Sequence, residues 1–237
     1  MLRLLAAFLA LLPLPAWADV TATYSAGKMT LLVESDDNGN SRIGIEGKFG
    51  IIRRDGFDYA VMALPNGETK VTELSELLSF ISAAVAGESK KDAASVLDKP
   101  FVLTMKGDVM VGDRKGTLWN FGPEKEKDGR AGQMKEFVMS ADPALAPVGA
   151  IFARTVEALM PLMAAIIPES TGFSAKARNL FSSGAPLRID TLVALQSVTV
   201  TEIDPKRFEL PAPVIPAMEF MMAMNPASGT GAFSPLP

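Results

Sequence analysis

Residues 41–63 read SRIGIEGKFGIIRRDGFDYAVMA. In the first part of this stretch, Ile43 and Ile45 alternate with charged residues. The Arg-Asp-Gly sequence at 54–56 is typical of a turn, and residues 57–64 then alternate again. An apolar period of two, interrupted by turn residues, indicates short strands with one buried face. The stretch therefore predicts three consecutive antiparallel strands.

The same pattern extends in both directions along the chain. Residues 28–36 alternate, and the Asn38-Gly39 pair that follows favours a hairpin because both positions accept a positive φ. A second Asn-Gly turn at 66–67 leads into a short strand at 68–72. Further strands are predicted at 101–111, with Gly107 as a bend or bulge, and at 116–121, 133–140, 186–191 and 193–203.

Three segments have helical periodicity instead, at 73–86, 143–167 and 172–182. Asp142 and Pro143 suit the start of the longest helix, as N-cap and first helical residue. This helix is apolar enough to raise the alternative of a membrane span. Its only charges, Arg154 and Glu157, are three residues apart and share a face, which favours an amphipathic helix.

The N-terminus resembles a secretory signal peptide. Arg3 precedes an apolar run at 4–14, and Ala16-Trp17-Ala18 places small residues at the cleavage position. We expect cleavage between Ala18 and Asp19 and a periplasmic location for the mature protein. The alternative is an uncleaved N-terminal anchor, for which the apolar run is short.

The composition excludes several kinds of catalysis and partner. The chain has no histidine and no cysteine, which removes Ser-His-Asp and Cys-His machinery and histidine-based zinc sites. Its 27 acidic residues exceed its 23 basic ones, for a net charge of −4, so nucleic acid is not an expected partner. We expect a non-enzymatic protein without a cofactor.

Three short motifs are compatible with ligand binding but favour other interpretations. The segment 107–112 has phosphate-loop glycine spacing but lacks the Lys and Ser/Thr that must follow. The segment 36–40 has calcium-loop oxygens but fits a hairpin better. Methionines within 218–224 suit Cu(I), although an apolar helix explains them equally. No metal site is predicted, and copper binding by these methionines stays an open question.

The order of strands and helices resembles the LolA and LolB lipoprotein carriers and uncharacterised exported domains similar to them. The stretches that carry this resemblance are 42–47, 51–59, 140–145, 184–189 and 204–211. The resemblance implies an α+β fold, a curved antiparallel β half-barrel with helices covering its concave face. It places one domain at 19–213 and leaves 214–237 as a Pro/Met/Gly-rich tail.

If the helices leave space inside such a half-barrel, the cavity is apolar and suits a lipid or acyl chain. The residues predicted to line it are Leu77, Leu78, Ile81, Leu159, Met160, Met163, Ile166 and Ile167. The alternative is a structural or interaction module of the cell envelope, in which the same side chains fill the core. The expected partner is thus an apolar ligand or an envelope protein, with no transmembrane segment in the mature chain.

Overall fold

The computed structural model describes residues 19–88, 99–124, 134–167 and 169–224. Within these ranges the fold is α+β, with one sheet of eleven strands and four α-helices. The strands are β1 (Val20–Ala26), β2 (Met29–Ser35), β3 (Ser41–Ile45), β4 (Phe49–Arg54), β5 (Phe57–Ala63), β6 (Thr69–Glu73), β7 (Phe101–Val111), β8 (Arg114–Pro123), β9 (Lys135–Ser140), β10 (Ala185–Ile189) and β11 (Val193–Val200). The helices are α2 (Leu74–Glu88), α3 (Ala146–Ile166), α4 (Phe173–Ser182) and α5 (Ala217–Met224). Short 3₁₀ turns are η2 (Pro143–Leu145), η3 (Glu169–Thr171) and η4 (Pro205–Phe208).

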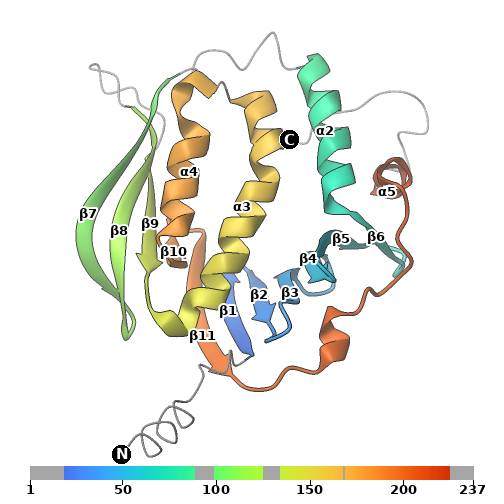
Figure 1. Ribbon diagram of the computed structural model, residues 1–237, viewed down its shortest axis with the longest axis horizontal. Coiled ribbons are helices and arrows are strands. Elements are labelled where there is room, and N and C mark those ends of the chain that lie inside the picture. The colour runs from blue at the N-terminus through green and yellow to red at the C-terminus, as the bar shows by residue number, and fades with distance from the viewer. Residues whose placement is uncertain (1–18, 89–98, 125–133, 168, 225–237) are drawn as a thin grey trace, which may run out of the picture.

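The sheet is open, and its strands follow the order β6-β5-β4-β3-β2-β1-β11-β10-β9-β8-β7. Every neighbouring pair of these strands is antiparallel. The first and last strands of the described sheet, β6 and β7, are not paired with each other, so the sheet does not close into a barrel. Helices α4, α3 and α2 lie side by side along it (Figure 1), and α3 contacts both of the others.

The sequence patterns predicted most of these strands. The meander from β2 to β6 is confirmed, with Asp36 accepting hydrogen bonds from the backbone N–H groups of Asn38 and Asn40 in the first hairpin. The bulge near Gly107 is also confirmed, because the β7–β8 register shifts between Met105 and Gly107. Strand β1 was missed, although it pairs with both β2 and β11 at the centre of the sheet.

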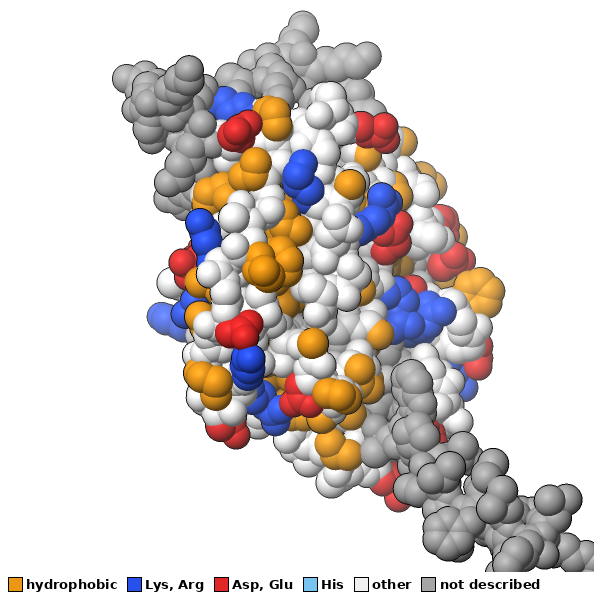
Figure 2. Space-filling view, turned by 60° about the vertical axis from the view of Figure 1, so that its left-hand side comes forward, with side chains coloured by type: hydrophobic (Ala, Val, Ile, Leu, Met, Phe, Trp, Pro, Cys, Tyr) orange, Lys and Arg blue, Asp and Glu red, His pale blue; other side chains and the backbone are white. Residues whose placement is uncertain are grey.

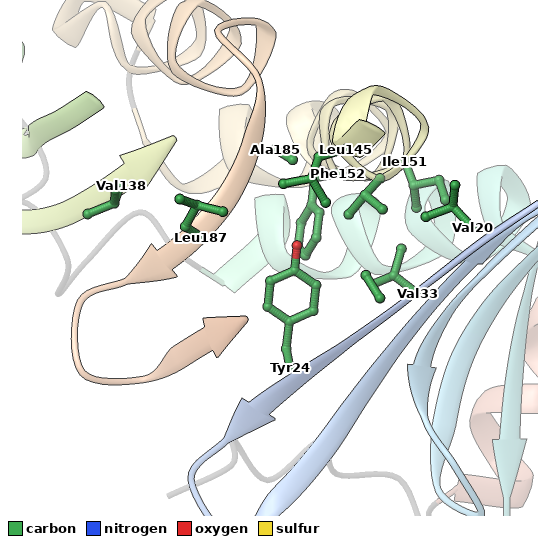
Figure 3. Close-up of a cluster of buried hydrophobic side chains, with 11 residues drawn as sticks. Val20, Tyr24, Val33, Val138, Leu145, Ile151, Phe152, Ala185 and Leu187 are labelled. Carbon is green, nitrogen blue, oxygen red and sulfur yellow. The ribbon is translucent and has the colours of Figure 1, made fainter. Parts of the chain in front are cut away.

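Tyr24 is the centre of the first buried cluster (Figure 3). Its ring lies against Phe152 of α3 in an edge-to-face arrangement, with centroids 5.5 Å apart. Its hydroxyl donates a 2.9 Å hydrogen bond to the carbonyl of Pro186 in β10. Because β10 and β11 pair through only two residue pairs, this bond from β1 reinforces a weak point of the sheet. Burial raises the pKa of the Tyr24 hydroxyl, which keeps it protonated as a donor.

Strand β9 is buried on both faces. Val138 belongs to the Tyr24 cluster, whereas Phe137 and Met139 belong to a second cluster with Phe101 and Phe121. Side chains alternate along a strand, so this division means that β9 has a packed layer on each side. The aromatic rings of the second cluster also meet Phe173 and Phe181, from α4.

Helix α3 and its preceding turn are the one described helical segment, Pro143–Ile166, with the length and hydropathy of a membrane span. Its two charges differ in their surroundings. Glu157 accepts two hydrogen bonds from Arg178 of α4. Arg154 is half-buried beside the Arg53–Asp58 ion pair, where burial first and Arg53 second lower its pKa.

The segment 203–216, which we call the C-terminal strap, leads from β11 to α5. It passes along β3 and β4 and reaches β6, where Ile215 N–H donates to the carbonyl of Val71. Figure 1 shows its path beneath β2, β3 and β4. Beyond the strap, part of the range predicted as a tail forms α5, whose Phe220 is fully buried against α2.

Gly184 permits the tight junction between β9 and β10. Its φ of +145° is rare for other residues, and a Cβ there would overlap the carbonyl of Ser140. We expect Gly184→Ala to lower the free energy of unfolding by at least about 2 kcal/mol, measured by urea denaturation. Gly112→Asn is the control, because its φ is +61° and nothing lies within 4 Å of a Cβ. Equal unfolding midpoints for the two variants would contradict the assignment.

Candidate functional site

The eight residues predicted to line an apolar cavity fall into two separate groups. Leu77, Leu78, Ile81 and Leu159 pack in a third cluster with Phe220 of α5. The other four, Met160, Met163, Ile166 and Ile167, pack in the second cluster with the aromatic residues of β7, β8 and β9. Helix α3 thus lies between the two groups and contributes to both.

Between the sheet and α3 the structure holds a pocket of about 10 Å³. Its walls include Ile43, Ile51, Ile151 and Ala158. A space of that size suits one water molecule and is far below the roughly 300 Å³ of typical ligand sites.

A larger pocket, of about 470 Å³, lies on the opposite face of the sheet. Val33 and Ile43 point toward α3, so their neighbours Glu34 and Arg42 must point to the other side, which we call the outer face. The pocket on it, named here the outer-face pocket, lies between β3–β6 and the C-terminal strap. Its apolar lining includes Gly44, Gly50, Ile52, Val61, Leu210 and Pro211.

Two glycines shape the floor of this pocket. Gly44 and Gly50 are paired across β3 and β4, and a Cβ on Gly44 would overlap the backbone of Gly50. The two strands can therefore come close together only without side chains at these positions. The consequence is a bare stretch of backbone on the outer face, which forms the base of the outer-face pocket.

The strap is held over this floor by an ion pair. Arg207 donates from Nε and Nη2 to the two carboxylate oxygens of Glu34, at 2.6 and 2.9 Å. Glu34 is 3% exposed, so this is a buried carboxylate with a bidentate partner. The hydrogen bond to Glu34 is the main cause of a raised pKa for Arg207, and Glu46, 4.0 Å away, adds to it.

Four basic residues line the outer-face pocket, namely Arg42, Lys48, Lys206 and Arg207. Arg207 is already paired with Glu34. Among the described residues, Arg42 forms no ion pair and no side-chain hydrogen bond. Lys48 reaches only the sulfur of Met29, at 3.6 Å. The pocket therefore combines an apolar floor with cations that are free to meet an anion.

Elsewhere on the surface, charges of opposite sign lie next to each other. Figure 2 shows red and blue side chains interspersed on the side of the molecule that carries β7 and β8. Three of the ion pairs from this region are Lys115–Asp108, Lys135–Asp190 and Arg188–Glu136. In the outer-face pocket, by contrast, Arg42 and Lys206 line the same space without a carboxylate partner in the described part of the chain, although the net charge of the protein is −4.

No local sequence pattern predicted the outer-face pocket, because its cations come from distant positions. Arg42 and Lys48 belong to the β3–β4 hairpin, whereas Lys206 and Arg207 belong to the strap. Arg42 lies in the stretch 42–47, and Lys206 and Arg207 lie in 204–211, two separate stretches that resemble carrier domains, whereas Lys48 lies outside both. Their proximity depends on the crossing of the strap, which no local pattern specifies.

No cluster of three or more carboxylates able to hold a metal ion occurs in the part of the chain that the structure describes. In α5, Met218 and Met222 are exposed, whereas Met221 packs against the third cluster. Two of the four methionines that could bind Cu(I), Met218 and Met222, are therefore exposed, and Met221 and Met224 pack against the protein.

Comparison with protein-family models, with curated proteins and with solved structures finds no match to this chain.

We expect Arg207→Ala to destabilise the fold, because it leaves the buried carboxylate of Glu34 without its partner. The free energy of unfolding in urea should fall by about 3 kcal/mol. Arg178→Ala is a matched control, since Arg178 makes the same bidentate contact with Glu157 but on the exposed surface. It should have a much smaller effect. Equal losses in both variants would show that the Glu34–Arg207 pair has no special role.

Proposed function

We propose that this chain is an exported, non-enzymatic binding protein that holds a small anionic molecule in the outer-face pocket. The observation that carries this proposal is the unpaired guanidinium of Arg42 beside Lys48 and Lys206, above an apolar floor. A half-buried cation without a partner is unfavourable, and an anionic ligand offsets that cost. The pocket volume of about 470 Å³ lies within the range of small-molecule sites.

A binding role fits the residues of the pocket better than a catalytic one. The sequence has no histidine or cysteine to act as base or nucleophile. The one buried carboxylate near the pocket, Glu34, has both oxygens engaged by Arg207. It therefore serves to position the strap.

The finer architecture that we propose is a curved half-barrel with α2 and α3 on its concave face. Support comes from the burial of inward residues, such as Val33 and Ile43, against α3, and from contacts of α2 with β5 and β6. Strand β9 has packed layers on both of its faces. At this end of the proposed half-barrel, side chains are therefore buried on both sides of the sheet. The relationship to the LolA-like carriers remains a proposal on the same architectural grounds.

We also propose that the mature chain begins at Asp19, in the periplasm, with α3 inside the folded domain. Asp19 accepts hydrogen bonds from the backbone N–H groups of Ile203 and Asp37 through its two carboxylate oxygens. The residue that follows the predicted cleavage is thus anchored in the fold. The ion pair between Glu157 and Arg178 of α4 supports a place for α3 within the folded domain.

An apolar ligand held by α2 and α3 stays a prediction from the sequence. Its eight residues pack within two clusters, so a bound acyl chain would require α2 or α5 to separate from α3. The alternative of an interaction module without a small ligand keeps the same packed interior.

Native mass spectrometry of protein purified from its own envelope compartment tests the proposed function. We expect a mass that corresponds to a chain starting at Asp19, together with a small acidic molecule that stays bound. Lys48→Glu combined with Lys206→Glu should abolish the bound species, because it reverses two charges at the pocket. The control is Lys28→Glu with Lys106→Glu, which makes the same change of charge at two exposed positions on other turns and strands.

Two results would contradict the proposal. One is wild-type protein without any bound acidic molecule, which would favour the interaction module. The other is retention of the ligand by the Lys48/Lys206 variant, which would move the site elsewhere. A bound apolar molecule would instead indicate a ligand site between the helices, as the sequence predicts.

A further inference from the structure

If the outer-face pocket is the binding site, its residues indicate which chemical class of anion it binds. Arg42 is the cation best placed to recognise it. This residue lies between Glu34 of β2 and Ile52 of β4 in the sheet register, and both Arg42 and Ile52 line the pocket. A guanidinium donates two parallel hydrogen bonds, which suits a planar carboxylate or a phosphate.

The local charge favours an anion with a single negative charge. The four cations of the pocket are accompanied by Glu34, Glu46, Glu209 and Asp204, so these side chains together carry no net positive charge. Asp204, at the start of η4, is one of the carboxylates that raise the pKa of Arg207. A phosphate monoester carries a charge of about −1.5 to −2 at pH 7, so these acidic side chains repel it more strongly than a carboxylate ligand, which carries −1.

The apolar lining of the pocket favours a ligand that has an apolar body in addition to its negative charge. Ile52 is 4% exposed, and Val61 and Leu210 are half-buried around the same space. Burial of such surface stabilises a ligand by roughly 25 cal/mol for each Å² removed from water. A ligand with a compact apolar body would therefore gain affinity that acetate or chloride would not.

We propose that the outer-face pocket binds a monocarboxylate with a compact apolar body, and that Arg42 is the residue that recognises the carboxylate. Lys48 and Lys206 contribute attraction from the rim, as point charges on flexible stems. Arg207 stays with Glu34 and keeps the strap in place. The inference rests on the proposed function and adds to it the class of ligand and the residue that selects it.

Isothermal titration calorimetry of the mature full-length protein tests this inference with four probes. Cyclohexanecarboxylate has both features, acetate has only the charge, cyclohexylmethanol has only the apolar body, and inorganic phosphate has a larger charge. We expect cyclohexanecarboxylate to bind at least about tenfold more tightly than the other three. Arg42→Gln should weaken its binding by at least about tenfold, and Arg42→Lys by an intermediate factor, because a lysine keeps the charge but loses the paired donors.

The control variant is Arg54→Gln, which removes an exposed arginine at the far end of β4 and should leave the affinity unchanged. If phosphate binds most tightly and depends on Arg42, the anion site stands but the carboxylate assignment is wrong. If cyclohexanecarboxylate binds equally to Arg42→Gln, the role of Arg42 is wrong. If none of the charged probes binds, the proposed function and this inference both fail.

Discussion

The ion pair between Glu34 and Arg207 is the constraint on which the outer face of this protein depends. A carboxylate that is 3% exposed needs a partner, and the partner belongs to a segment 173 residues further along the chain. The pair holds η4, at the start of the C-terminal strap, on the outer face, where η4 also contacts β3 and β4. The crossing of the strap creates a wall opposite Gly44 and Gly50, and it delivers the strap to Val71 and α5 to α2. One buried contact thus links the pocket, the edge strand β6 and the last helix.

The other face of the sheet is organised by α3. Its first half packs with Tyr24 and Val33, and its second half separates two clusters that contain α4 on one side and α2 with α5 on the other. Strand β9 contributes side chains to packed layers on both faces of the sheet. The interiors are packed, so space for a ligand lies in surface pockets, including one of about 480 Å³ along α3 and α4. The outer-face pocket under the strap is distinguished from that one by its four basic residues, and this is the basis of the proposed function.

Alternating residues and turn residues predicted β2 to β6 and the bulge of β7, because these signals are local. Strand β1 was not predicted from the sequence. Its inward residues, Val20, Ala22 and Tyr24, alternate with Thr and Ser, but two of these three inward residues are small or polar, which weakens the apolar pattern. The apolar stripes of α2 and α3 correctly predicted buried helical faces. The same pattern of apolar residues occurs in a helix that fills a core and in a helix that lines a cavity, so it could not distinguish the two. The pocket could not be predicted, because it joins Arg42 to Lys206, and only the tertiary path of the strap brings them together.

The central claim is that the strap is docked on the outer face in the mature protein. The chain has no cysteine, so Thr30→Cys on β2 and Pro213→Cys on the strap, both exposed positions, can carry a pair of spin labels without background labelling. Double electron–electron resonance should give one narrow distance distribution, centred on the separation of these positions in the structure. A broad distribution that extends to much longer distances would mean that the strap is undocked, and the pocket would then not exist as described.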